Sequence, residues 1–327
     1  MNSINNNNIK ISVVFPNYNH ANFIKQSLAS IIGQRTYIYE CIIGDDASID
    51  NSVEIIDNLI LGYNFISFIK NKSNKGLFEN SNYLIQRTEG THIHVTAVDD
   101  FTHSEFYSNA LFLLNKYPRA GLSCTGVHII DLENNKESDY DLNLGPEDRY
   151  FSPADLAKLL DRRPINSTGC VYNKDLFLKS GGFIPELRWY TDTFINHVLA
   201  FRYGICYTPK ILVSMRSHAI SFSNKRNRPF KEEIKACRKV FELLQSDEYR
   251  DVYPYFVKTQ CLAAFSMMPV YAVLLTPSLW DRYSLKIVWG YSWNRFKTIL
   301  ASRLPGFMMN FYRKFIRKIY SLHCMQI

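Results

Sequence analysis

The amino-acid sequence predicts an α/β fold: a single, mostly parallel central sheet flanked by helices, with a helical appendage at the carboxyl-terminal end. Two observations carry this prediction. Through residue 98, short apolar and β-branched segments alternate with amphipathic segments of helical period, joined by short connections. This is the pattern of a parallel sheet covered by helices. After Arg228 longer helical periodicity replaces the alternation, which places a boundary near residue 230.

The first strand and the first helix can be located by their residue patterns. Residues 11–15 form a β-branched, apolar run that ends at Pro16, so they predict a buried strand. A helix is expected from about residue 21 to residue 32, because its apolar side chains recur every three to four positions and share one face. Asn19 is the candidate cap of this helix.

The same alternation continues along the chain. A second strand at residues 39–43 runs into Gly44-Asp45-Asp46, and a helix capped by Ser48 or Asn51 is expected after it. The next predicted elements are a strand at 65–70, a helix at 77–88 and a strand at 91–98. Residues 132–148 are polar and acidic and predict a loop or a hairpin.

The predicted domain organisation has three parts. Residues 1–9 are expected to be a polar tail, residues 10–229 the first domain, and residues 230–327 a helical region. Within that region residues 259–280 carry no charge. Two prolines and several polar residues interrupt this stretch, so a buried helical pair is expected rather than a membrane span.

The net charge of +8 is concentrated at the end of the chain, because residues 282–327 contain nine Lys or Arg and no Asp or Glu. From residue 305 onward, aromatic and apolar residues share one helical face, opposite Arg313, Lys314, Arg317 and Lys318. This pattern predicts a helix that lies on an anionic membrane surface. The alternative is a helix packed on the first domain. No nucleic-acid partner is expected, because no recognisable nucleic-acid-binding fold accompanies the charge.

The cysteines and the amino-terminal end indicate the compartment. The seven cysteines are scattered, with no CxxC pair, which argues against a zinc ribbon and against a disulfide framework. The first eight residues are polar and lack the apolar run of a secretory signal. We therefore expect a cytoplasmic protein, peripheral at the inner face of the cell membrane.

Polar clusters follow three of the predicted strands: Pro16-Asn17-Tyr18-Asn19, Asp45-Asp46 and Asp99-Asp100. In parallel sheets, ligands bind beyond the carboxyl ends of the strands, so these clusters are expected to open into one crevice. The first strand–helix turns contain no GxGxxG and no GxxxxGK[ST] motif, so neither a dinucleotide-binding fold nor a P-loop is supported.

Asp99 and Asp100 are the strongest candidates for binding a cation. They could cap the helix that follows, but Thr102 and Glu105 have the spacing of a capping box and leave both aspartates available. Adjacent carboxylates at a strand end suit Mg²⁺ or Mn²⁺ bound to the phosphates of a nucleotide.

Three segments together carry a resemblance to a known family: VVFPNYNHANFIKQSLASIIGQ, YECIIGDDASIDNSVEII and NKGLFENSNYLIQRTEGTHIHVTAVDD. In order, spacing and identity they resemble the amino-terminal half of family 2 glycosyltransferases, and the resemblance extends over about residues 10–225. It implies the GT-A fold, which binds nucleotide-diphospho-sugars.

The resemblance also implies which residues bind the nucleotide of the donor. Pro16 and Tyr18 would line the nucleoside pocket, and Asp46 would accept a hydrogen bond from the base. Lys75 would lie near the diphosphate, with an exposed loop lysine as the alternative.

The metal and diphosphate site is implied in the same way. Asp99 would contact the ribose or the metal, and Asp100 would ligate the cation. Arg216 and His218 lie in a segment that matches a loop near the diphosphate in the family, which makes His218 a candidate phosphate or metal contact. The alternative for His218 is a loop histidine without a role.

Asp192 is the expected catalytic base. It aligns with an acidic motif of the family that often reads Glu-Asp, of which only the Asp is present here. Without the Glu, the sequence does not indicate which residue holds the Asp192 carboxylate in place. A carboxylate within hydrogen-bond reach of the acceptor hydroxyl can remove its proton. Asp192 could instead cap its own helix, although Thr191 and Thr193 are alternative caps.

The sequence thus predicts a metal-dependent, inverting glycosyltransferase of surface-polysaccharide synthesis. Its expected donor is a nucleotide-diphosphate-sugar, with a UDP-sugar considered first, and its expected acceptor is a glycan or a polyprenyl-linked sugar. The main alternative is a catalytically silent module of the same fold that only binds a nucleotide-sugar or glycan. A nucleotidyltransferase would require a glycine-rich basic loop after the first strand, which residues 16–20 lack.

Overall fold

A computed structural model describes residues 9–219, 228–264 and 267–303. Its strands are β1 Ile11–Asn17, β2 Glu40–Asp45, β3 Ile66–Lys70, β4 His92–Val95, β5 Phe101–Thr102, β6 Leu122–Asp131, β7 Lys136–Tyr140, β8 Arg149–Phe151, β9 Cys170–Asn173 and β10 Ile205–Ser217. The α-helices are α1 Ala21–Ile32, α2 Ser52–Leu59, α3 Leu77–Ile85, α4 Phe106–Lys116, α5 Pro153–Leu159, α6 Lys174–Lys179, α7 Thr191–Tyr203, α8 Phe230–Gln245, α9 Tyr253–Thr259, α10 Met268–Leu274 and α11 Arg282–Arg303. The short 3₁₀ helices are η1 Arg35–Tyr37, η2 Ser167–Gly169, η3 Pro185–Tyr190, η5 Cys261–Ala264 and η6 Pro277–Leu279.

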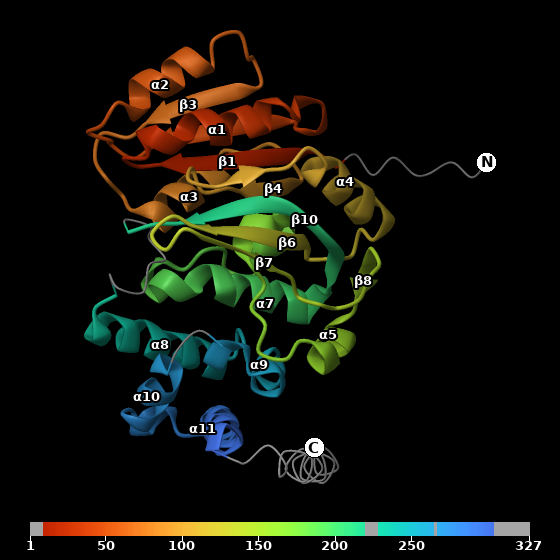
Figure 1. Cartoon of the computed structure of the whole chain (residues 1–327), viewed down its shortest axis with the longest axis vertical. Coiled ribbons are helices and arrows are strands. Elements are labelled where there is room, and N and C mark those ends of the chain that lie inside the picture. Colours follow the sequence, from red (N-terminus) through yellow and green to blue (C-terminus); the bar gives the residue numbers. More distant parts are fainter. Residues whose placement is uncertain (1–8, 220–227, 265–266, 304–327) are drawn as a thin grey trace, which may run out of the picture.

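The ten strands form one sheet, which confirms the predicted fold class (Figure 1). The hydrogen-bonded order is β3-β2-β1-β4-β9-β6-β10-β5, with β7 paired to β6 and β8 paired to β10. Strands β1 to β4 are mutually parallel, as the alternation predicted. Strand β9 runs antiparallel to both of its neighbours, so the sheet as a whole is mixed. The expected hairpin after residue 132 is the β6–β7 pair.

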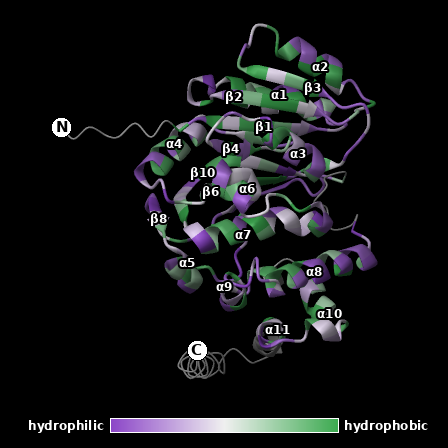
Figure 2. Cartoon of the chain, turned by 180° about the vertical axis from the view of Figure 1, so that it is seen from behind, coloured by the Kyte–Doolittle hydropathy of each residue, from purple (hydrophilic) through white to green (hydrophobic). Residues whose placement is uncertain are grey.

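The sheet separates two hydrophobic clusters. Along β1, Val13 and Phe15 belong to one cluster while Val14, between them, belongs to the other. This alternation follows from the two-residue period of a strand, which points successive side chains to opposite faces. Hydrophobic residues run along the central strands, whereas the surrounding helices carry both hydrophobic and hydrophilic stretches (Figure 2). Both faces of the sheet are therefore buried.

The carboxyl-terminal helices extend one of these clusters. Helix α7 lies between the sheet and the helices α8 and α9 (Figure 1). Phe256 of α9 stacks on Phe194 of α7, with ring centroids 5.9 Å apart, and meets Phe201 of α7 edge-on at 5.3 Å. The predicted boundary near residue 230 coincides with the start of α8, and the hydrophobic cluster continues across it.

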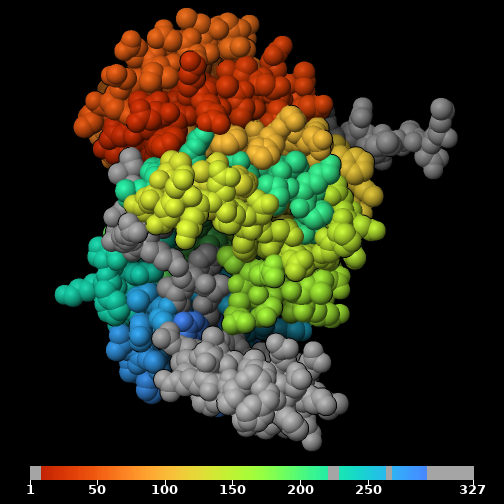
Figure 3. Space-filling view, viewed as in Figure 1, coloured from red at the N-terminus to blue at the C-terminus, as the bar shows by residue number. Residues whose placement is uncertain are grey.

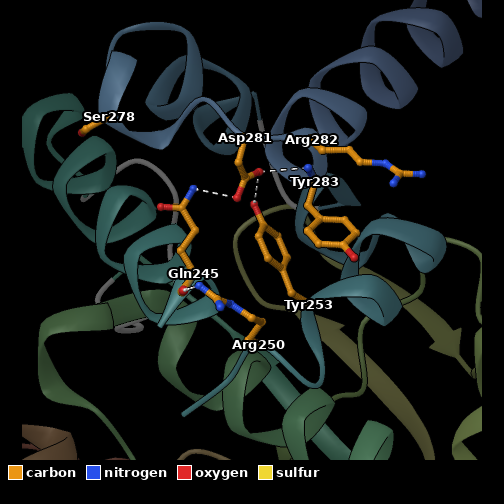
Figure 4. A pocket seen from close by; sticks show the side chains of 7 residues that line it. All are labelled: Gln245, Arg250, Tyr253, Ser278, Asp281, Arg282 and Tyr283. Carbon is orange, nitrogen blue, oxygen red and sulfur yellow. Dashed lines mark hydrogen bonds between the residues drawn. The ribbon is translucent and has the colours of Figure 1, made fainter. Parts of the chain in front are cut away.

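Asp281 joins three of these helices. Its carboxylate caps α11 by accepting from the backbone N–H groups of Tyr283 at 2.9 Å and Ser284 at 2.7 Å. It also accepts from Gln245 of α8 and from the Tyr253 hydroxyl of α9 (Figure 4). Asp281, Gln245, Tyr253 and Tyr283 line a hollow of about 420 Å³ that is built from the carboxyl-terminal helices and their connections.

The described parts of the uncharged stretch, residues 259–264 and 267–280, do not form a long helix. They contain the end of α9, the short helices η5 and η6, and α10, in which Val270, Ala272 and Val273 are buried. Among the described residues, no helix has both the length and the apolar character needed to cross a bilayer. The predicted polar tail, apart from residue 9, and the predicted membrane-surface helix from residue 305 onward lie outside the described residues.

Three predicted caps are wrong. Neither Ser48 nor Asn51 caps α2: the Asn51 side chain makes no cap hydrogen bond, and Asp50 accepts from the Ser52 backbone N–H at 3.0 Å. Asn19 does not cap α1: its side chain accepts from the Ile49 backbone N–H at 2.8 Å, and Asp50 accepts from the first N–H of the helix, on Ala21, at 3.0 Å. The Thr102–Glu105 capping box does not form either. Thr102 lies in β5, where it pairs with Val213 of β10, and its hydroxyl accepts from the Gln34 side chain instead of capping the helix.

Candidate active site

Asp45 is the last residue of β2 and Asp46 follows it, and the two have different partners. Both carboxylates are buried. Asp45 accepts from Asn17 at 2.7 Å and from the Ser48 hydroxyl at 2.5 Å, so it fixes the turn that leaves the strand. Asp46 accepts from the backbone N–H of Lys75 at 3.0 Å and that of Gly76 at 2.8 Å. Asp46 therefore ties the loop before α3 to the end of β2.

The other residues predicted to line the nucleoside pocket surround these two turns. Pro16 is buried within β1, opposite Gly44 of β2. Tyr18, directly after β1, is 41% exposed, so its ring can be reached from solvent. The ammonium group of Lys75 lies 3.6 Å from the centroid of the Tyr83 ring. The structure thus gathers Pro16, Tyr18, Asp46 and Lys75 around the carboxyl ends of β1 and β2.

Asp100 directly precedes β5 and is buried, with only 3% of the residue exposed. One oxygen accepts from the Arg216 backbone N–H at 2.9 Å and the other from the Thr168 hydroxyl at 3.0 Å. Burial raises the pKa of Asp100 well above its usual range, and the neighbouring charge of Asp99 adds to this increase. A nearby positive charge would therefore stabilise its ionised form.

Asp99 faces a different group of side chains. Its carboxylate lies 3.0 Å from Nε2 of His218, which follows β10. His218 stacks on Phe23 of α1, with centroids 4.9 Å apart, and its ring meets that of His20 at 6.1 Å. Three separate parts of the chain, the β1–α1 turn, the segment after β4 and the end of β10, therefore meet at this point.

These contacts form a possible metal site. Ligand atoms of His20, Asp99 and His218 all lie within 4.8 Å of one another. One carboxylate and two imidazoles are a donor set that divalent transition metals accept in proteins. A cation placed between them would replace the hydrogen bond from His218 to Asp99. The residues present therefore fit a divalent cation, and they include Asp99 rather than the predicted Asp100; the assignment of Asp100 as a ligand stays a prediction.

Arg216 braces the same corner. Its guanidinium donates to the Asp99 backbone carbonyl at 2.6 Å and to the side chain of Gln26 on α1. It lies over the rings of Phe101, at 4.8 Å, and Phe23, at 5.4 Å. Its positive charge is thus fixed beside the Asp99–Asp100 pair.

Asp192 lies in the first turn of α7, whose N-cap position is occupied by Tyr190 and has no side-chain cap. One oxygen accepts from the Ser167 hydroxyl at 3.0 Å, and the other accepts from the backbone N–H of Thr193 at 2.6 Å. Burial raises the pKa of Asp192, although these two hydrogen bonds and the charge of Arg228 act in the opposite direction. The hydroxyl of Ser167 thus holds the Asp192 carboxylate in a chain that has Thr191 in place of the Glu of the family motif.

The helix η2 connects Asp192 to the acidic pair. Ser167 donates to Asp192, and the next residue, Thr168, donates to Asp100. The backbone of this turn is held by the buried His94, whose Nε2 lies 3.2 Å from the Thr168 carbonyl oxygen. The predicted base and the predicted cation-binding pair therefore share one short, anchored element.

Several residues of this site carry no signal in the sequence. Ser167 and Thr168 are two hydroxyl residues in an irregular segment, and only the packing of η2 against β6, β10 and α7 gives them their partners. His20 follows a turn and has no ligand-like spacing to another histidine. A motif search cannot find such residues, because their partners are distant in sequence.

A family model described as "Glycosyl transferase family 2" matches residues 12–180. The chain is 28% identical over 127 residues to EpsE of Bacillus subtilis (strain 168), a protein named as a glycosyltransferase. It is 29% identical over 108 residues to an uncharacterized glycosyltransferase of Haemophilus influenzae. These matches cover 38% and 33% of this chain, and 46% and 43% of the respective relatives, so the chain spans about half the length of either relative.

Solved structures share the fold at low sequence identity. TarS 1-349 of S. aureus in complex with UDP-GlcNAc aligns with a TM-score of 0.64 at 15% identity, covering 81% of this chain and 80% of that one. The mannosyltransferase PcManGT of Pyrobaculum calidifontis, in complex with GDP-Man and Mn²⁺, aligns with a TM-score of 0.56 at 15% identity, covering 94% and 83%.

Proposed function

The chain belongs to glycosyl transferase family 2, and from this premise we propose that it transfers a sugar, with inversion, from a nucleotide-diphosphate-sugar to an acceptor hydroxyl. The observation that supports this proposal best is the η2 turn, in which consecutive hydroxyls hold Asp192 and Asp100. A base and a diphosphate site must lie on either side of one anomeric carbon for direct displacement.

Asp192 is the proposed general base. The acceptor hydroxyl attacks the anomeric carbon from the face opposite the nucleotide, its proton passes to Asp192, and the bond to the nucleoside diphosphate breaks. The raised pKa of Asp192 suits this role, because a carboxylate that binds a proton more tightly is a better base. One displacement with no covalent intermediate inverts the configuration.

The donor is proposed to bind across the ends of β1 and β2. Tyr18 and Pro16 would contact the nucleoside, Asp46 its base, and Lys75 the diphosphate. Asp100, as predicted, and Asp99 with His218, which the geometry favours, would hold Mg²⁺ or Mn²⁺. When bound, the cation would neutralise charge that develops on the leaving diphosphate, and the guanidinium of Arg216 would add to this effect. A UDP-sugar is the first donor to test.

The experiment is a transfer assay with UDP-, GDP- and dTDP-sugars, each with Mn²⁺ and with Mg²⁺. We expect release of a nucleoside diphosphate with one donor class and, by NMR, a product anomer opposite to that of the donor. A product of the same anomeric configuration would contradict the inverting mechanism. Donor binding without transfer or hydrolysis would instead support the silent binding module.

The acceptor is proposed to be a glycan or polyprenyl-linked sugar of surface-polysaccharide synthesis, reached at the inner face of the cell membrane. Besides the basic end of the chain, the described helices offer a surface with both apolar and basic side chains. Five large apolar side chains of α10, α11 and the segment between them are each 46–61% exposed: Leu274, Leu275, Trp280, Leu285 and Trp289. Arg282, at the start of α11, is exposed as well. Exposed Trp and Leu beside basic groups suit the interface of an anionic bilayer.

Vesicle flotation tests the membrane proposal. The whole chain is expected to bind vesicles that contain phosphatidylglycerol more tightly than neutral vesicles, and less tightly as salt increases. Replacing Leu285 and Trp289 by Asp should weaken binding at least about fivefold. Leu61→Asp is the matched control, because Leu61 is 73% exposed but lies between α2 and β3. Equal binding of both variants would contradict the proposal.

A further inference from the structure

His20 has one ring nitrogen fixed by the backbone. Its Nδ1 lies 2.7 Å from the carbonyl oxygen of Tyr18. A carbonyl oxygen only accepts hydrogen bonds, so Nδ1 must carry the proton. In the neutral ring the lone pair is then on Nε2. Metal-binding histidines in proteins are usually oriented in this way, by a second hydrogen bond that sets the tautomer.

The turn that carries His20 is anchored on both sides. The Asn19 backbone N–H donates to the Ser48 hydroxyl at 2.9 Å, and the Asn19 side chain accepts from Ile49 at 2.8 Å. On the other side, Ala21 donates to Asp50 at 3.0 Å. The loop after β2 therefore fixes the backbone of residues 19 to 21, and the imidazole of His20 needs little rearrangement to act as a ligand.

The chemistry of the three side chains favours one class of cation. Mg²⁺ binds oxygen ligands almost exclusively and keeps much of its water shell. Imidazole nitrogen is a good ligand for first-row transition metals, and a site with two imidazoles discriminates against Mg²⁺. With His218 as the only imidazole, this preference would be weaker.

We infer that His20 is a third protein ligand of the donor-bound cation, together with Asp99 and His218, and that it makes the site prefer Mn²⁺ over Mg²⁺. This inference rests on the proposed function, because the cation is the one expected to hold the nucleoside diphosphate. It also connects the two halves of the donor site: the carbonyl that orients His20 belongs to Tyr18, which is proposed to line the nucleoside pocket.

The test is a direct measurement of metal binding to the whole chain. Free Mn²⁺ is titrated by electron paramagnetic resonance with UDP and, separately, with GDP, and Mg²⁺ binding is measured by competition. The wild-type chain is expected to bind Mn²⁺ at least about tenfold more tightly than Mg²⁺. His20→Gln should weaken Mn²⁺ binding at least about tenfold and change Mg²⁺ binding by less than about threefold. His20→Glu should restore binding with a smaller preference for Mn²⁺.

His128→Gln is the matched control, because His128 also contacts a carboxylate, Asp139 at 2.8 Å, but lies on the β6–β7 hairpin. Unchanged Mn²⁺ binding in His20→Gln, or equal binding of the two cations by the wild-type chain, would overturn the inference. If His20 contacts the diphosphate instead, the variant will lose UDP affinity without metal and keep its Mn²⁺ preference, which also overturns it. Failure of the proposed function is distinguishable, because the wild-type chain would then release no nucleoside diphosphate from any donor, whether or not His20→Gln changes its binding of Mn²⁺.

Discussion

Ser167 is the residue on which the basicity of Asp192 depends. Its hydroxyl donates to a carboxylate that burial makes more basic, and this hydrogen bond limits the increase. Only ionised Asp192 can accept the acceptor's proton. Activity is therefore expected to fall as the pH decreases through the pKa of Asp192, at a higher pH than for an ordinary aspartate.

Replacing Ser167 by Ala should shift the loss of activity at low pH, the acid limb of the pH profile, to higher pH. Without the hydroxyl the ionised carboxylate loses a hydrogen bond, so the pKa of Asp192 rises further. The loss of kcat/KM should be largest at low pH and should recover as the pH increases. The pH profile of kcat/KM measures the effect.

Ser108→Ala is a suitable control, because the Ser108 hydroxyl is a surface group that donates to the Glu105 carbonyl. A Ser167→Ala profile with an unmoved acid limb would show that this hydroxyl does not tune the base, even if overall activity decreased.

At this scale the sequence predicts acidic residues better than their partners. Asp99, Asp100 and Asp192 can be selected because they stand at element ends in family-like motifs. The side chains that bond to their carboxylates, such as Ser167 and His218, lie 25 to 119 positions away. Sequence spacing contains no information on such pairs until the fold is known. For the same reason the sequence does not identify His20, the second imidazole beside Asp99.

At the scale of elements, the junction between α7 and β10 depends on a glycine. Gly204 ends α7 with φ 75° and ψ 178°, a region that is essentially restricted to glycine. A Cβ there would lie 2.4 Å from the carbonyl oxygen of Phe151 on β8. This junction orients α7, which carries Asp192, relative to β10, which leads to Arg216 and His218.

Gly204→Ala should lower the free energy of unfolding by on the order of 2 kcal/mol or more, because backbone strain and a clash with backbone both contribute. Gly62→Ala is the matched control: Gly62 has φ 84° but open space around it, so only the strain applies. Denaturant unfolding compares the two variants. Equal losses would mean that the contact with β8 has no energetic consequence.

The order and type of the amino-terminal elements could be predicted, because the residue pattern of each is local. The caps could not. For α1, Asp50 of a later loop takes the role expected of Asn19, and for α4, the Thr102 hydroxyl is held by the side chain of Gln34, which follows α1. The antiparallel strand β9, which enters between β4 and β6, is likewise a product of long-range pairing.

At the scale of the whole molecule, the carboxyl-terminal helices share a hydrophobic core with the sheet domain. The space-filling view shows the amino-terminal segments at one end and the carboxyl-terminal helices at the other (Figure 3). Phe256 packs on both Phe194 and Phe201 across the predicted boundary. Helix α7, which carries the proposed base Asp192, therefore depends on the appendage for part of its burial.

We accordingly predict that the chain unfolds in one cooperative transition, and that a variant ending at residue 229 loses stability and exposes the apolar surface of α7. Scanning calorimetry of both proteins measures this, with dye binding as the readout of exposed apolar surface. Two separate transitions in the whole chain, with a truncated protein as stable as the first of them, would show that the two regions fold independently.

The most direct test of the account is the turnover of Asp192→Asn. The variant should retain donor binding within about threefold and should lose kcat by about 10²–10⁴-fold, because the position keeps its shape but not its base. Asp57→Asn, which changes a surface aspartate paired with Lys70, should retain wild-type turnover. Asp192→Asn with full turnover would contradict the assignment of the catalytic base.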